Sequence, residues 1–166
     1  MRAVMFRRPR GFFGREQGAQ ALVEFALVLP VFLLVVTGVL DTARAVWQEN
    51  TLAYAAREGT RYAIVHGTGG NPVVGPCTSC VNPPASNHNL DLVVKAVTDN
   101  AIGVYNISVT IDYPGIGSPT PTVCNYRTCP VVVDATAPFV PLPSYYLLGG
   151  AFQLTLRGGS KLYIQR

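Results

Sequence analysis

The chain has 166 residues, of which 49% are hydrophobic and only 13% are charged, about half the charged share of an ordinary soluble domain. This length allows one modest domain together with one extended element. The net charge of +4 comes from the N-terminal tail, because the chain from Asp41 onward carries eight basic and seven acidic side chains. The rest of the chain therefore lacks the concentrated basic surface that binding to phosphates requires, which argues against nucleic acid as a partner.

Residues 1–19 form a basic segment in front of an apolar run. They contain a single acidic residue, Glu16, against five arginines, which are Arg2, Arg7, Arg8, Arg10 and Arg15. Basic residues beside an apolar run mark the cytoplasmic side of a membrane protein. We therefore expect a basic cytoplasmic leader at 1–19, with the remainder of the chain outside the cytoplasm.

Residues 20–40 are expected to form the membrane part of a helix. From Phe25 to Leu40 there is no charge, and twelve of these sixteen residues are Leu, Val or Phe. These twelve favour insertion by about 4–7 kcal/mol, more than the roughly 2.5–3.5 kcal/mol that one acidic residue costs at the centre of a bilayer. A helix over 20–40 rises about 31 Å, close to the hydrocarbon thickness of about 30 Å.

Two residues within this segment are unusual for a membrane helix. Pro30 removes one backbone donor and should bend or weaken the helix locally. Glu24 places a carboxylate at the start of the apolar run, and three interpretations remain open for it. The segment can be a plain signal anchor in which Glu24 reaches the interface, a secretory signal cleaved after Ala43-Arg44-Ala45, or a prepilin-type leader. In the prepilin type, a glutamate follows the cleaved bond at the head of the helix.

The helical pattern continues beyond the membrane part, to residue 66. Residues 41–66 contain no proline and one glycine, and they offer two i,i+3 pairs of opposite charge, Asp41 with Arg44 and Glu58 with Arg61. One helix over 20–66 would be roughly 70 Å long. Its small residues Ala55, Gly59 and Ala63 form a smooth strip, either under the chain's own C-terminal part or against another subunit.

The outer half is expected to be a small α+β head. Residues 67–89 read as an irregular loop rich in proline and glycine, and 90–166 as an extracytoplasmic helix followed by an antiparallel sheet. Within it, apolar residues at helical spacing predict a short helix from Leu90 to about Gly103. Strands are predicted at 105–113, 130–140, 151–156 and 161–165.

Four cysteines occur as Cys77-x-x-Cys80 and Cys124-x4-Cys129. Outside the cytoplasm they should form two disulfides, with local pairing preferred over cross-pairing. A four-thiolate zinc site is a less favoured interpretation, because an oxidising compartment works against free thiolates. A thioredoxin-like role for the first pair is also less favoured, because the pair lies in a loop without the strand-to-helix context that lowers the pKa of a thiol. We find no catalytic arrangement, no metal site and no cofactor motif in the sequence.

The combined string GAQALVEFALVLP, Asp41, Arg44 and NTLAYAAREGTRYA at 50–63 resembles the TadE-like family, minor pilin-like proteins (pseudopilins) of the tight-adherence pilus. The resemblance implies a pilin-like fold and leader cleavage by a prepilin peptidase near Gly18, Ala19 and Gln20. Glu24 falls at mature position 6 after a cut following Gly18, and at the usual position 5 only after a cut following Ala19. The exact bond therefore stays open.

The resemblance also implies a partner set and a location. The mature chain would be a single-pass protein of the cytoplasmic membrane, associating with other pilin-like subunits and the pilus assembly machinery, or entering a surface pilus that serves adhesion. Glu24 would compensate the new α-ammonium of its own or a neighbouring chain, since an unpaired charge in an apolar environment is costly. The alternatives are a bitopic membrane protein whose outer domain binds a ligand or partner and, less favoured, a tethered CxxC thiol oxidoreductase.

Overall fold

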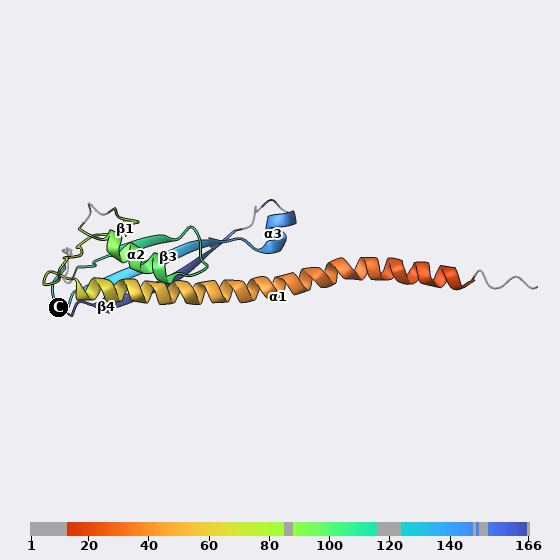
Figure 1. The fold of residues 1–166 in the computed structure, drawn as a ribbon, viewed down its shortest axis with the longest axis horizontal. Helices are drawn as coiled ribbons and strands as arrows, with labels where there is room; N and C mark the ends of the chain where they lie inside the picture. The colour runs from red at the N-terminus through yellow and green to blue at the C-terminus, as the bar shows by residue number, and fades with distance from the viewer. Residues whose placement is uncertain (1–12, 85–87, 116–123, 148, 150–152, 166) are drawn as a thin grey trace, which may run out of the picture.

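The computed structural model describes residues 13–84, 88–115, 124–147, 149 and 153–165. One long helix carries a small head along its C-terminal half, and its N-terminal half projects beyond the head (Figure 1). In chain order the elements are α1 (Phe13–Val65), β1 (Cys80–Val81), α2 (Asp91–Asn100), β2 (Ser108–Asp112), β3 (Pro130–Phe139), α3 (Leu142–Leu147) and β4 (Leu154–Tyr163). The predicted class, α+β with a long N-terminal helix and a small antiparallel sheet, is confirmed.

Helix α1 has 53 residues and is therefore about 80 Å long. It begins at Phe13, earlier than the predicted residue 20, because residues 13–19 contain no proline and continue the helical hydrogen bonding. It ends at Val65, close to the predicted 66. Beyond this end the backbone turns back, with the Val74 N–H donating to the His66 carbonyl at 2.7 Å. The glycine-rich sequence at 67–70 allows this reversal.

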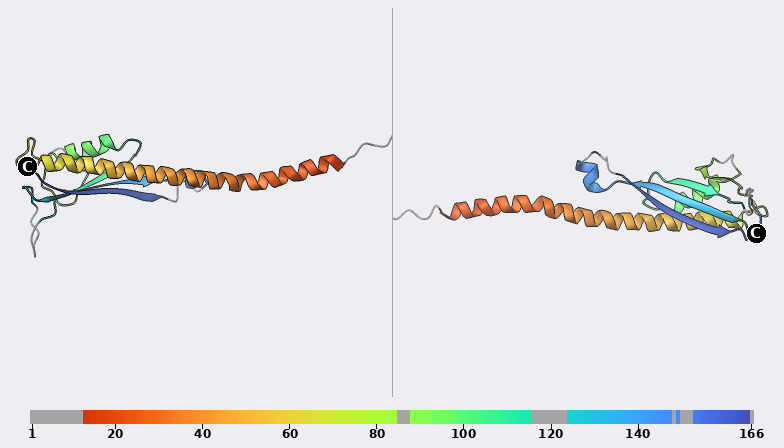
Figure 2. Two further views of the ribbon diagram at one scale, coloured as in Figure 1. Left: turned by 90° about the horizontal axis from the view of Figure 1, so that it is seen from below. Right: turned by 180° about the vertical axis from the view of Figure 1, so that it is seen from behind.

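The four strands form one antiparallel sheet in the order β1-β2-β3-β4, so each strand pairs with its neighbour in sequence. The sheet and α2 both pack on the C-terminal half of α1, and the second view of Figure 2 shows the strands running alongside it. The strand predicted at 130–140 is present as β3, and its burial alternates: Val131, Val133, Ala135 and Ala137 are at most 2% exposed. This period of two places one face of the sheet in the core.

The two strands predicted at 151–156 and 161–165 are wrong as separate elements, because the structure has one strand, β4, from Leu154 to Tyr163. The pair Gly158-Gly159 does not break the strand. Instead, a Cβ added at Gly158 would collide with the backbone of Leu52 and Ala53 on α1. A glycine is required here so that the strand and the helix backbone can lie in contact.

Two short elements were not predicted. Strand β1 has only two residues, which is too few to show an alternating pattern, and it forms by pairing Cys80 with Ile111 and Val81 with Thr110 of β2. Helix α3 has six residues, of which one is a proline, and a second proline precedes it. Both depend on contacts with distant parts of the chain, and a sequence pattern does not reveal these.

We expect Gly158→Ala to lower the free energy of unfolding by about 1–3 kcal/mol, because the added methyl group overpacks a contact between two backbones. Chemical denaturation of the full chain in detergent micelles, followed by circular dichroism, measures this value. The matched control is Gly159→Ala, whose methyl would meet only the Asp134 carboxylate, a side chain that can move. Equal losses at the two positions would contradict the role assigned to Gly158.

Candidate functional site

The N-terminal half of α1 is an apolar helix that the head leaves uncovered. Its side chains from residue 18 to 40 are exposed, apart from half-exposed Thr37, and among the large apolar ones Leu27 (72%) and Leu22 (70%) have the largest exposed fractions. This part of α1 is long and apolar enough to cross a membrane. A soluble protein rarely exposes so large a continuous apolar surface, so the surface needs an apolar partner.

Glu24 lies on this uncovered surface with an exposed side chain, and it makes no hydrogen bond or ion pair with the described residues. The predicted leader-processing residues Gly18, Ala19 and Gln20 are exposed on the same helix, one to two turns before it. The distance along the axis from Gln20 to Glu24 is about 6 Å, at 1.5 Å per residue. A charge created near residue 20 would therefore lie within reach of the Glu24 carboxylate.

Helix α1 continues through Pro30 without ending. The proline has no N–H, so the carbonyl four residues earlier lacks its usual partner. The polar side chains that follow are satisfied within the helix itself. The Thr37 hydroxyl donates to the Leu33 carbonyl at 2.9 Å, and the Thr42 hydroxyl donates to the Gly38 carbonyl at 2.9 Å. This hydroxyl pairing lowers the cost of placing threonines in an apolar environment.

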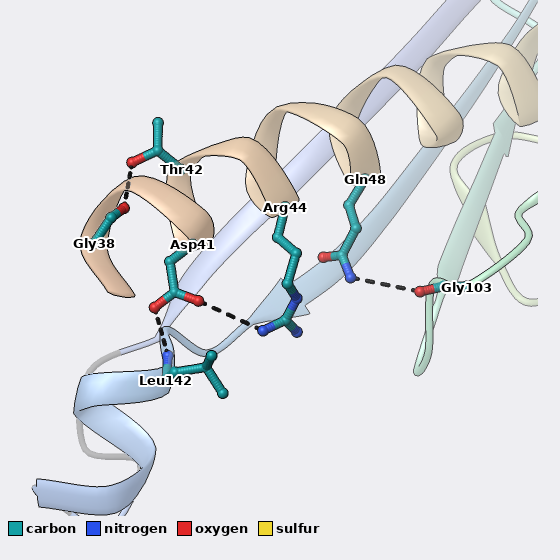
Figure 3. Close-up of polar contacts among 7 residues, drawn as sticks. All are labelled: Gly38, Asp41, Thr42, Arg44, Gln48, Gly103 and Leu142. Atoms are coloured by element: carbon teal, nitrogen blue, oxygen red, sulfur yellow. Dashed lines mark hydrogen bonds and ion pairs between the residues drawn. The ribbon is translucent and has the colours of Figure 1, made fainter. Parts of the chain in front are cut away.

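Asp41 joins the end of the apolar run to the head (Figure 3). Its side chain is nearly buried, one carboxylate oxygen accepts the Leu142 N–H of α3 at 2.7 Å, and the other lies 3.5 Å from the Arg44 guanidinium. The Arg44 guanidinium in turn lies over the Phe139 ring, 5.4 Å from its centroid. The predicted pair of Asp41 with Arg44 is present, and Asp41 additionally orders the connection between β3 and α3.

The Asp41–Leu142 bond spans 101 positions of the chain. Sequence reasoning identified Asp41 and Arg44 but missed Leu142, because the donor is a backbone N–H that any residue except proline would supply. The only available signal was Pro141 and Pro143 on either side of Leu142, which leave it as the one donor among the three residues. That pattern does not identify its acceptor.

The small-residue strip lies under the chain's own head. Ala55 and Ala63 are fully buried, and a Cβ added at Gly59 would contact Val93 and Val97 of α2 and Val133 of β3. The strip thus lets a helix and a strand approach α1 at one point. Of the two alternatives in the sequence analysis, the structure shows the intramolecular one.

The cysteines pair locally, Cys77 with Cys80 and Cys124 with Cys129, which is the arrangement that the sequence analysis preferred. The first pair links Cys77, in the loop before β1, to Cys80, the first residue of β1, and the Tyr113 N–H donates to the Cys77 carbonyl at 2.8 Å. The second closes a turn, and the Cys129 carbonyl accepts the Ile164 N–H at 2.9 Å. The disulfides thus close short local loops, and these backbone hydrogen bonds join the loops to Tyr113 and to the C-terminal segment.

The described part of the chain contains no group of three or more His, Cys, Asp or Glu side chains that could hold a metal ion. Its histidine at the end of α1, His66, stacks on Tyr62 and uses Nδ1 at 2.8 Å from the Tyr62 carbonyl. Burial raises the pKa of Tyr113, which keeps the phenol neutral as a donor to the Val74 carbonyl. These groups have structural partners and do not form a reactive arrangement.

The structure defines the class of protein: an α+β head packs on the C-terminal half of a long helix, and the N-terminal half of that helix is exposed and apolar. Residues 19–61 match the model of the family described as TadE-like protein, which confirms the resemblance over these residues of α1. The match includes Glu24 and the Asp41–Arg44 pair and ends before the sheet begins. No curated protein and no solved structure matches the chain.

We expect Asp41→Ala to lower the free energy of unfolding by about 1–3 kcal/mol, because it leaves the Leu142 N–H without its charged acceptor. Hydrogen exchange of the full chain in micelles should also show faster exchange at Leu142. Glu49→Ala is the control, because Glu49 is exposed on the same helix and has no partner among the described residues. Unchanged exchange at Leu142 would show that Asp41 does not order α3.

Proposed function

We propose that this protein is a membrane-anchored, prepilin-like protein that acts in the assembly of a tight-adherence pilus or as a minor component of it. The observation that carries the proposal is the TadE-like match on α1, which includes the uncovered apolar half of the helix and Glu24. The basic residues at 1–19 support a cytoplasmic N-terminus, with the head on the opposite side of the membrane.

Association with other subunits would occur along residues 18–40. The C-terminal half of α1 is occupied by the chain's own sheet and α2, so its small-residue strip is not available for a second helix. The uncovered half presents no such obstacle. Within a bilayer, apolar side chains give little net drive for helices to associate, and polar contacts and close packing decide which helices pair.

Glu24 would supply the deciding polar contact. Between residues 18 and 40 it is the one charged side chain. After cleavage near Gly18, Ala19 or Gln20, the new α-ammonium and the Glu24 carboxylate would be opposite charges in a medium of low dielectric constant, where their attraction is strong. Pairing with a neighbouring chain would hold two helices in one register, and pairing within the chain would lower the cost of inserting the new terminus.

The proposed function predicts maturation by a prepilin peptidase. Protein extracted from membranes of a strain with the peptidase should begin at Ala19 or Gln20, and protein from a peptidase-deficient strain should retain residues 1–18. Intact mass and N-terminal sequencing distinguish the two. A start at Met1 in both strains would favour the bitopic protein that never enters a filament. A start at Val46 in both strains would indicate a secreted domain and contradict the proposal.

The proposed function also predicts that Glu24 is needed for association with other subunits. We expect Glu24→Ala to reduce co-purification with pilin-like subunits and surface piliation by about tenfold, the effect of losing 1.4 kcal/mol of pairing energy. Membrane insertion should be retained, because removal of a carboxylate makes the helix more apolar. Glu49→Ala, on the part of α1 beside the head, is the matched control and should assemble normally. Normal assembly of the Glu24→Ala protein would show that the carboxylate has no role in association.

A further inference from the structure

Helix α3 lies beside α1 at the level where the apolar run ends (Figures 1 and 3). The Leu142 N–H at its start bonds to Asp41, the first charged residue after Glu24. Beyond this bond, α3 faces the uncovered half of α1 and not the core of the head. The connection between β3 and β4 thus extends past the sheet, toward the part of the chain with membrane character.

A groove of about 410 Å³ separates α3 from α1. It is continuous with the uncovered apolar surface of α1, and its side chains carry no charge. The α1 wall consists of Pro30, Leu33, Leu34 and Thr37, and the α3 wall consists of Leu142, Pro143 and Tyr146. The one hydroxyl in the α1 wall, that of Thr37, is already bonded to the carbonyls of Leu33 and Leu34.

The backbone at the start of α3 exposes few unpaired donors. A helix usually leaves its first N–H groups without intrahelical partners. Here Pro141 and Pro143 have no N–H, the Leu142 N–H donates to Asp41, and the Tyr145 N–H donates to the Pro141 carbonyl at 3.0 Å. A segment in contact with lipid has to satisfy its backbone groups internally in this way.

The side chains around α3 also suit a membrane interface. From Ala135 to Leu156 the sequence contains no charged residue. Tyr145 and Tyr146 are 62% and 78% exposed, and their rings meet edge to face. Tyrosine combines an apolar ring with a polar hydroxyl, and it is enriched where hydrocarbon gives way to headgroups. The described surface of α3 therefore resembles an interfacial segment more than the surface of a water-exposed head.

We propose that α3 docks into the outer leaflet of the membrane, and that the groove between α3 and α1 holds the acyl chain of a phospholipid. This inference rests on the membrane anchorage that the proposed function assumes. The tyrosines would lie at the boundary between headgroups and hydrocarbon, and Asp41 would lie just above it. The head would then be held against the membrane by two elements, α1 and α3, and its tilt relative to the bilayer would be restricted.

The placement and lining of the groove favour an acyl chain over a helix of a second copy. The residues of its α1 wall, from 30 to 37, extend about 10 Å along the axis, which is about two helical turns. A second helix would therefore contact this wall over a short length, whereas a flexible acyl chain can follow it. Within a bilayer, apolar side chains give little net drive for two helices to associate, and the Thr37 hydroxyl of the groove is already bonded within α1.

Fluorescence quenching by brominated phospholipids tests the inference. The full chain, with its single tryptophan replaced by Trp47→Phe, is reconstituted in phosphatidylcholine vesicles whose acyl chains carry bromine near the glycerol end or near the methyl end. Tyr146→Trp then introduces a reporter on α3, and Tyr145→Trp provides a second one if the first perturbs folding. Leu27→Trp is the control within the span, because Leu27 is exposed on α1 and does not line the groove, and Tyr126→Trp is the control beside the second disulfide. Circular dichroism confirms that each variant is folded.

We expect the reporter on α3 to lose fluorescence most with bromine near the glycerol end, Leu27→Trp to be quenched by both lipids, and Tyr126→Trp to be unaffected. Quenching at Leu27 without quenching at either α3 position would overturn the inference while leaving the anchorage intact. No quenching at Leu27 would instead contradict the anchorage itself. If Tyr146→Trp is protected and a photo-crosslinker at the same position joins two chains, the occupant is a second copy and the lipid proposal is wrong.

Discussion

The structure depends on how closely the head packs against the second half of α1. Glycine makes this contact possible at two points: Gly158 of β4 lies against the helix backbone at Leu52 and Ala53, and Gly59 of α1 lies beneath Val97 of α2. Larger residues at these points would push β4 and α2 away from α1 and would expose the core valines to water. The contact also divides α1 into a covered half and a bare half. All the functional features discussed above follow from that division.

Asp41 lies at the boundary between these two halves. One oxygen of this nearly buried carboxylate accepts a backbone N–H from α3, and the other makes no hydrogen bond but lies 3.5 Å from the Arg44 guanidinium. On its N-terminal side, the helix has the apolar surface of a membrane span. On its C-terminal side, the helix is part of a disulfide-fastened α+β head. One charged residue thus connects the exposed apolar half of α1 to the head.

Both proposals about function assume that the exposed half of α1 lies in a membrane. A bare apolar helix gains little from contact with other apolar helices in lipid, so its polar exceptions carry the specificity. Glu24 is that exception on the uncovered half, and α3 is the one described element of the head that reaches this half. The first would guide association between subunits, and the second would set the height and tilt of the head. The covered half is already filled by the chain's own core and contributes stability.

The sequence by itself determined the features that depend on neighbouring residues. The apolar run at 25–40, the end of α1 close to residue 66, the pair of Asp41 with Arg44 and the strand at 130–140 follow from local composition and periodicity. The TadE-like resemblance belongs to the same helix. Only the tertiary structure decided that Gly158-Gly159 continues a strand, that the strip at Ala55, Gly59 and Ala63 is covered by the head, and that Leu142 reaches Asp41. These depend on atoms distant in the chain, whose approach has no local signature.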